Sequence, residues 1–157
     1  MKIKLITIGK TSEKYLLEGI NEYVKRLGRF TKFELIELSD VKNGNSFPIK
    51  ELQLLEAKKI EEYTGKNNGL LYLLDEKGKE YTSSVFAQFI TKSMNTGKDI
   101  SFVIGGAFGF DSAFKEKADG LISMSKMTTT HQLIRLIFTE QLYRAFSIIE
   151  NLPYHNE

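Results

Sequence analysis

Two loops of this chain carry residue types that could hold a ligand. The first, SFVIGGAFGFD, passes from a hydrophobic segment ending at Ile104 into Gly105-Gly106 and then Gly109. Glycine has no Cβ, so the backbone here can approach a ligand closely, and a glycine turn after a buried strand is a common ligand site in α/β proteins. A tight strand-to-helix turn that serves only the fold is the alternative interpretation of this loop.

The second loop, Ser125 to Thr130, reads SKMTTT and follows a short apolar segment. Thr129 and Gln132 form a capping-box pattern, which predicts that a helix begins directly after the loop. Small polar side chains and exposed backbone groups can hydrogen-bond a purine edge without any charged side chain. An ordinary capped helix start would explain Thr129, but it would not explain why a second polar loop follows the glycine-rich loop so closely.

Several other kinds of site are excluded by the motifs. Gly9-Lys10-Thr11 resembles the end of a phosphate-binding P-loop, but that pattern requires a glycine at the position of Lys4. The chain has no cysteine and only two histidines, His131 and His155, which are too few for a convincing metal site, so we expect no bound metal. A Gly-x-Ser-x-Gly elbow of the kind found in serine hydrolases is also missing from the sequence.

The elements that must position these loops follow from the hydrophobic periodicity. We expect strands at 2–8, 32–38, 69–75, 100–104 and 121–124, and helices at 13–29, 49–63, 83–94, 112–118 and 130–150. Their alternation predicts an α/β fold with a mostly parallel sheet flanked by helices on both faces. Ligands of such sheets bind beyond the carboxyl ends of strands, where residues 9–12, 105–111 and 125–130 are expected to lie. The turn-rich segment 40–48 is predicted to be a mobile loop.

Length and charge bound the class of protein. The 157 residues suit a single domain, 1–157, and the apolar stretch Leu5 to Ile8 is too short for a signal peptide or a membrane span, so we expect a cytoplasmic protein. The net charge of +2 does not by itself indicate nucleic acid. Residues 1–32, however, hold eight lysines and arginines against three glutamates, 8 − 3 = +5, which fits either a solvated amphipathic helix or a surface that faces a polyanion.

The expected last helix has an unusually broad apolar surface. Its apolar residues cover about half of the circumference, which is wider than the stripe of about 100° on a one-sided surface helix. Such a helix is buried between layers or packs against a second subunit, so a homodimer is plausible. Two of the four arginines, Arg135 and Arg144, lie on this helix, and Arg144 could simply form a surface pair with Glu140.

Three segments together resemble a known family. FVIGGAFGF, SMSKMTTTHQLIRLIFTEQLYRAFSI and the terminal PYH are similar to the RlmH family of SPOUT-class methyltransferases, and the likeness runs along the whole chain. The resemblance implies a deep trefoil knot in the carboxyl-terminal part, an exception to the rule that chains are unknotted. It also implies S-adenosylmethionine-dependent methylation of N3 of a pseudouridine in 23S (large-subunit) ribosomal RNA, on assembled ribosomes.

The resemblance also implies roles for particular residues. It implies that the following residues bind S-adenosylmethionine: Leu74, Gly105, Ser125, Lys126, Met127, Thr128, Thr129 and Thr130. Relatives commonly have proline where this chain has Thr130, so the loop is expected to keep its path with less rigidity. The expected catalytic residues are His131, Arg135, Arg144, Tyr154 and His155. Arg135, Arg144 and Tyr154 are expected to position the reactants with His131 beside the cofactor, and the group that assists loss of the N3 proton is left open among His131, Arg144, Tyr154 and His155.

The length of the last helix leads to a further expectation. It carries the tail about 30 Å from the polar loop of the same chain. A partner related by twofold symmetry could present its tail there instead, so each pocket would combine one chain's loops with the other chain's tail. Two alternatives of other classes remain, namely a nucleotide-binding α/β module whose glycine loop holds a phosphate, and a non-enzymatic ribosome-associated dimer.

Overall fold

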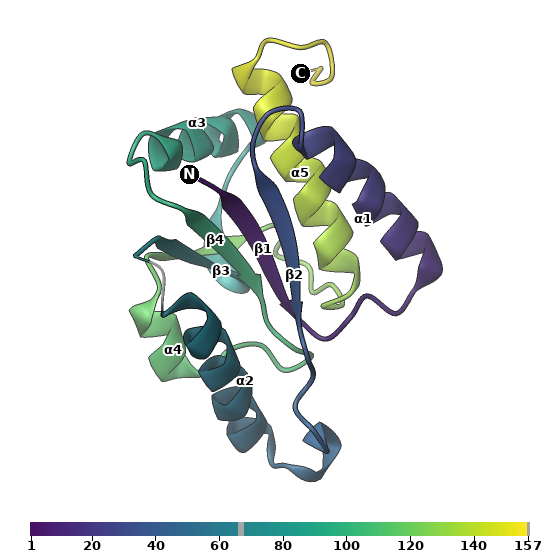
Figure 1. The fold of residues 1–157 in the computed structure, drawn as a ribbon, viewed down its shortest axis with the longest axis vertical. Coiled ribbons are helices and arrows are strands. Elements are labelled where there is room, and N and C mark those ends of the chain that lie inside the picture. Colours follow the sequence, from purple (N-terminus) through teal and green to yellow (C-terminus); the bar gives the residue numbers. More distant parts are fainter. Residues whose placement is uncertain (66–67, 157) are drawn as a thin grey trace.

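The computed structural model describes residues 1–65 and 68–156 as alternating strands and helices (Figure 1). In chain order the elements are β1 (Ile3–Ile8), α1 (Lys14–Leu27), β2 (Phe33–Leu38), the 3-10 turn η1 (Gly44–Ser46), α2 (Ile49–Thr64), β3 (Leu70–Glu80), α3 (Ser83–Met94), β4 (Ile100–Ile104), α4 (Ser112–Lys117), β5 (Gly120–Ser123) and α5 (Leu133–Ile149). The predicted α/β alternation is therefore confirmed.

All five strands belong to one parallel sheet with the order β2-β1-β4-β3-β5. Strand β1 pairs with a neighbour on each side: Ile3 lies opposite Phe33 of β2 and opposite Ile100 of β4. Because every strand runs in the same direction, the five carboxyl ends lie along one edge of the sheet. Every loop expected to hold a ligand is thereby brought to that edge.

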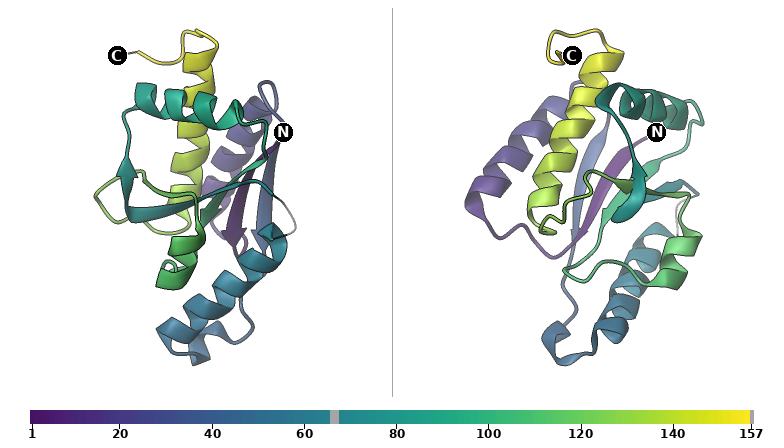
Figure 2. Two further views of the ribbon diagram at one scale, coloured as in Figure 1. Left: turned by 90° about the vertical axis from the view of Figure 1, so that its left-hand side faces the viewer. Right: turned by 180° about the vertical axis from the view of Figure 1, so that it is seen from behind.

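Alternating side chains of the strands build a separate core on each face of the sheet. Ile3 and Leu5 of β1 belong to the core shared with α1, α3 and α5, whereas Ile6 and Ile8 belong to the core shared with α2 and α4. Figure 2 shows these two groups of helices on opposite sides of the sheet. This arrangement confirms that helices flank both faces, as a parallel sheet with apolar residues on both sides requires.

The helix connections also create a crevice at the carboxyl edge. The chain leaves β1 toward α1 on one face and leaves the neighbouring strand β4 toward α4 on the other face. Loops that diverge from adjacent strands in this way leave an opening at the switch point between them. The glycine-rich loop after β4 therefore lies where the topology favours a ligand.

Strand β3 is longer than the predicted segment 69–75. Residues between Leu74 and Lys79 leave the ladder with β5 and the strand then resumes pairing, so that Ile122 faces both Leu74 and Lys79. A salt bridge of 2.6 Å from Lys115 to Asp75 ties this bulge to α4. Gly78 packs directly on β5, because a Cβ at this position would lie 2.6 Å from the backbone nitrogen of Ile122.

The start of α5 also differs from the prediction. The helix begins at Leu133 rather than at Thr130, and the hydroxyl of Thr130, not that of Thr129, accepts a hydrogen bond from the Leu133 amide at 3.1 Å. The predicted capping role of Thr129 is therefore wrong, because the side chain of Gln132 binds the loop after β1 instead of closing a capping box. The broad apolar surface of α5 is explained by its packing between α1 and α3.

The close approach of Gly78 to β5 predicts a marked effect of the smallest substitution. Gly78→Ala should lower the free energy of unfolding by about 1–3 kcal/mol, because the added methyl group meets backbone that cannot move aside easily. Gly120→Ala in β5 is the matched control, since its Cβ would lie at an ordinary 3.4 Å from the Tyr72 ring. Urea unfolding of both variants measures the difference, and equal midpoints would contradict this account of the bulge.

Candidate active site

A cavity of about 470 Å³ opens between the carboxyl ends of β3, β4 and β5, and we call it the β3–β5 pocket. Its walls come from the ends and following loops of these strands, with further contributions from α2, α4 and the start of α5. The lining residues are Gln53, Leu74, Asp75, Glu76, Lys77, Ile104, Gly105, Gly106, Ala107, Phe108, Gly109, Phe110, Lys115, Met124, Ser125, Met127, Thr128, Thr129, His131 and Ile134. The volume falls within the usual range of small-molecule sites.

The lining of this pocket suits a ligand that is partly aromatic and partly polar. Leu74, Ile104 and Ile134 supply an apolar surface, and the 124–129 loop supplies hydroxyl and backbone groups. The glycine turn packs closely, since a Cβ at Gly105 would lie only 3.1 Å from the Phe110 ring. An adenosyl group has the same division between an apolar ring face and polar edges, so the residues present fit S-adenosylmethionine.

A second cavity, of about 700 Å³, lies on the other side of the end of β4, and we call it the β1–β2 pocket. Its lining comes from the end of β1, the 40–46 loop, α2 and the glycine-rich loop, and consists of Ile8, Asp40, Val41, Asn43, Gly44, Asn45, Ser46, Leu52, Glu56, Gly106, Ala107, Phe108 and His131. Gly106, Ala107, Phe108 and His131 line both cavities. We call these four residues the dividing wall.

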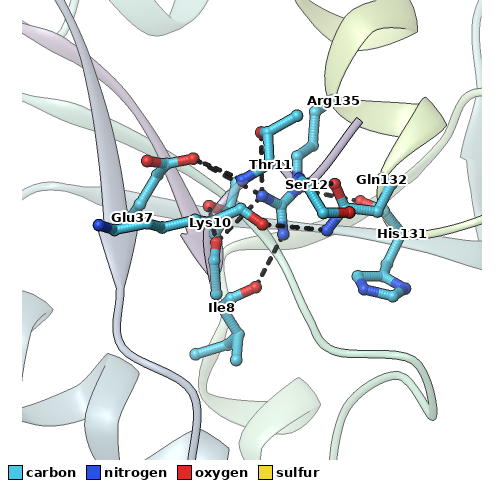
Figure 3. A network of polar contacts seen from close by, with 10 residues as sticks. Ile8, Lys10, Thr11, Ser12, Glu37, His131, Gln132 and Arg135 are labelled. Carbon is cyan, nitrogen blue, oxygen red and sulfur yellow. Dashed lines mark hydrogen bonds and ion pairs between the residues drawn. The ribbon is translucent and has the colours of Figure 1, made fainter. Parts of the chain in front are cut away.

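A fully buried arginine ties one residue of this wall, His131, to the end of β1. Arg135 is 0% exposed and donates from Nη2 to the carbonyl of Ile8 at 2.7 Å and from Nη1 to the carbonyl of Gly9 at 3.0 Å. Its Nε donates to the carbonyl of His131 at 3.1 Å (Figure 3). Burial lowers the pKa of Arg135, and the nearby carboxylate of Glu37 opposes that shift. The guanidinium thus joins the end of β1 to the start of α5.

Gln132 forms a second bridge between the same two segments. Its Oε1 accepts from the Ser12 amide at 3.0 Å, and its Nε2 donates to the Lys10 carbonyl at 3.1 Å. In Figure 3 the imidazole ring of His131 points away from this network. Burial, and secondarily the charge of Arg135, hold the pKa of His131 below its usual 6.5, so the ring is neutral at pH 7.

Comparison with known proteins identifies the family. A family model described as a predicted SPOUT methyltransferase matches residues 1–155. The ribosomal RNA large subunit methyltransferase H of Streptococcus uberis is 48% identical over 158 residues, which cover 99% of both chains, and that of Parabacteroides distasonis is 46% identical over the full length of both. The chain belongs to the SPOUT methyltransferase family. Membership confirms the predicted family and enzyme class, an S-adenosylmethionine-dependent methyltransferase.

Solved structures support the fold of this SPOUT methyltransferase. A probable methylase family protein of Haemophilus influenzae aligns with a TM-score of 0.58 at 13% identity, covering 99% of this chain and 70% of the other. A putative methylase family protein of Neisseria gonorrhoeae gives 0.55 at 11% identity, covering 90% and 81%. The deep trefoil knot in the carboxyl-terminal part is the feature that the SPOUT family implies for this fold.

The structure brings most of the predicted cofactor residues to one cavity. Leu74, Gly105, Ser125, Met127, Thr128 and Thr129 all line the β3–β5 pocket. Lys126 and Thr130 do not line it. The exposed side chain of Lys126 reaches Glu80 at 3.8 Å, and the hydroxyl of Thr130 accepts a hydrogen bond from the Leu133 amide. Asp75, Glu76 and Lys77 also line this pocket and were not predicted from the sequence. They lie in the bulge of β3, and nothing in this charged segment predicts a bulge beside the pocket.

The predicted catalytic residues fall into separate places. His131 lies in the dividing wall and Arg135 is buried behind it, whereas Arg144, Tyr154 and His155 lie together at the opposite end of α5. Arg144 donates to Glu140 at 2.6 Å and lies over the Tyr154 ring, 4.8 Å from its centroid. Burial, together with hydrogen bonds to Tyr23 and Glu140, raises the pKa of Tyr154, so its hydroxyl stays protonated.

Among residues 1–65 and 68–156 the structure contains no group of three or more histidine, aspartate or glutamate side chains arranged to hold a metal ion. Within the same residues no helix is long and apolar enough to span a membrane.

The buried guanidinium predicts that lysine cannot replace arginine at position 135. In Arg135→Lys a single ammonium cannot reach the carbonyls of Ile8, Gly9 and His131 together, and each buried carbonyl left unsatisfied costs about 1–3 kcal/mol of stability. Affinity for S-adenosylmethionine should also fall, because His131 is no longer held. Chemical unfolding and calorimetry measure both effects, with the exposed Arg29→Lys as control. If Arg135→Lys were as stable as the wild type, the hydrogen bonds of Arg135 to these carbonyls would not be needed for stability.

Proposed function

We propose that this protein transfers the methyl group of S-adenosylmethionine to N3 of a pseudouridine in large-subunit ribosomal RNA of assembled ribosomes. The observation that carries the proposal is the β3–β5 pocket, which gathers the glycine-rich turn and the 125–129 loop at one cavity. Full-length relatives named ribosomal RNA large subunit methyltransferase H support the choice of substrate. We therefore also propose that the enzyme acts in the cytoplasm, where ribosomes are found.

The work left to the protein is mainly positioning. S-adenosylmethionine supplies a methyl group that its sulfonium already activates. The chain must hold that donor in line with the acceptor nitrogen and exclude competing water. The β3–β5 pocket provides the enclosure, and His131 in the dividing wall is an ionisable side chain that lines both cavities. Because this ring is neutral at pH 7, it can accept a hydrogen bond or a proton.

We propose that the protein forms a homodimer of single-domain subunits, residues 1–157, and that the residues near the carboxyl terminus act in the partner's site. Arg144, Tyr154 and His155 lie at the end of α5 opposite to the dividing wall, as Figure 1 shows for the carboxyl terminus. Two large side chains at the amino-terminal ends of α1 and α5 are exposed, namely Tyr15 at 67% and Leu133 at 38%. Pairing of two chains through this region would cover those residues and bring each tail toward the partner's pocket.

Thermal melting with candidate ligands tests the cofactor part of the proposal. A ligand that binds only the native state raises the melting temperature, and 100-fold excess over Kd corresponds to about 2.7 kcal/mol. We expect S-adenosylmethionine and S-adenosylhomocysteine to raise it, and ATP and NAD to leave it unchanged. A shift with ATP or NAD and none with the adenosyl compounds would favour a nucleotide-binding module instead.

The substrate is tested by transfer of labelled methyl groups to ribosomes from a strain that lacks this enzyme. We expect the label in large-subunit RNA, at N3 of one pseudouridine when the product is mapped by mass spectrometry. A protein that binds S-adenosylmethionine but never labels ribosomes would instead be a non-enzymatic ribosome-associated dimer or would act on another substrate.

A mixed dimer tests the shared site. One chain carries Gly105→Trp, which fills its own pocket, and the other lacks everything after Asn151; two affinity tags allow purification of the mixture. If tails act in the partner's pocket, one pocket carries both defects and the other carries none, so about half of the wild-type activity returns although each parent dimer is inactive. Circular dichroism first checks that Gly105→Trp is folded. Absence of any recovered methylation would refute the shared site.

A further inference from the structure

The proposed function requires two neighbouring binding sites, and the structure has a cavity on either side of the end of β4. A methyl transfer brings a donor and an acceptor into contact, so the acceptor must lie next to the donor site. The β3–β5 pocket accounts for the donor. The β1–β2 pocket shares Gly106, Ala107, Phe108 and His131 with it, and this second cavity has not yet been given an occupant.

The apolar part of the β1–β2 pocket offers a surface for a flat ring. Phe108 in the dividing wall is 53% exposed, although phenylalanine is usually buried. Val41 and Leu52 add apolar atoms to the same cavity. Bases that are taken out of an RNA stack are commonly held by stacking on an aromatic side chain, so this lining suits a nucleobase.

The polar part of the pocket includes two carboxylates. Glu56 is 9% exposed, and its Oε2 accepts from the Gly106 amide at 3.3 Å, so this carboxylate lies against the dividing wall. Asp40 lies farther along the pocket, beside Gly9, where an added Cβ would come within 2.5 Å of its carboxylate. Within residues 1–65 and 68–156 no salt bridge joins Asp40 or Glu56 to a lysine or arginine side chain.

Two carboxylates that face one cavity disfavour a phosphate and favour N–H donors. Asp40 and Glu56 both line this cavity. Burial raises the pKa of Glu56, and the charge of Asp40 acts in the same direction. Ionised carboxylates only accept hydrogen bonds. A phosphate offers no donor and would be repelled, whereas a base with ring N–H groups would be bound.

Pseudouridine differs from uridine in this kind of group. Its ring is joined to ribose through carbon, so both N1 and N3 carry a hydrogen, whereas N1 of uridine is bonded to the sugar. When N3 occupies the same place in the two nucleosides, the N1–H of pseudouridine lies where uridine has a carbon-bound hydrogen. An acceptor at that position therefore distinguishes the isomerised base from uridine.

We propose that the β1–β2 pocket holds the target pseudouridine, with Phe108 against its ring, Glu56 facing N3–H and Asp40 accepting N1–H. This inference rests on the proposed function and adds to it the residues that recognise the base. Glu56 takes the N3 edge because it contacts the wall behind which the donor is bound. Asp40, on the far side, then determines the preference for pseudouridine over uridine.

Kinetics with two kinds of ribosome test this assignment. Both lack the methyl group, and one kind also comes from a strain without the enzyme that isomerises the target uridine. Wild-type enzyme should prefer the isomerised ribosomes. Asp40→Ala should lose about 10- to 100-fold in kcat/KM on these ribosomes and less on the others, because the acceptor for N1–H is removed and uridine has no N–H at that position. Asp40→Asn should show a smaller loss, since an amide oxygen still accepts.

Two further variants separate stacking from a general effect. Phe108→Ala should lower kcat/KM by about 5- to 150-fold on any ribosome that is methylated, because stacking does not depend on the identity of the base. Glu62→Gln, an exposed change on α2, is the control and should leave both rates unchanged. Calorimetry should find wild-type affinity for S-adenosylmethionine in Asp40→Ala, since Asp40 does not line the β3–β5 pocket.

The possible outcomes distinguish this inference from the proposed function. If wild-type enzyme methylates neither kind of ribosome, the proposed function fails and the inference fails with it. If wild-type enzyme is active but Asp40→Ala keeps the wild-type preference, or loses activity equally on both ribosomes, only the inference is overturned.

Discussion

The buried guanidinium of Arg135 is the interaction on which the site depends. A charge that is fully removed from water is stable only when its hydrogen-bonding groups are satisfied, and here the partners are carbonyls of two segments far apart in sequence. One segment ends β1 in the middle of the sheet and the other begins α5. The contact therefore fixes where the last helix starts, and with it the place of His131.

The parallel sheet places two cavities next to each other at its carboxyl edge. All carboxyl ends meet at one edge, so the loop after β4 stands between the loops of β1 and β2 on one side and those of β3 and β5 on the other. Gly106, Ala107 and Phe108 form a thin partition because two of them have small side chains or none. A partition of this kind suits a reaction in which one small group passes between two bound molecules.

The sequence was sufficient to predict the features that depend on local pattern. Hydrophobic periodicity predicted five strands and five helices in the right order, and the glycine turn after Ile104 was correctly placed at the carboxyl edge of the sheet. Features that depend on distant partners could not be predicted. The bulge after Leu74 involves the close contact of Gly78 with β5. The start of α5 at Leu133 goes with the hydrogen bonds of Gln132 to the loop after β1. Asp40 and Glu56, which line the β1–β2 pocket, belong to no sequence motif. The separation of Tyr154 from His131 was foreseen, since helix length alone determines it.

The central claim is that the dividing wall separates a donor site from an acceptor site. A crystal structure of the protein with S-adenosylmethionine and a short RNA containing pseudouridine tests it most directly. The account predicts the adenosyl group in the β3–β5 pocket, with its methyl group directed at the wall, and the base in the β1–β2 pocket against Phe108. Electron density for the adenosyl group in the β1–β2 pocket, or for the base away from both cavities, would contradict it.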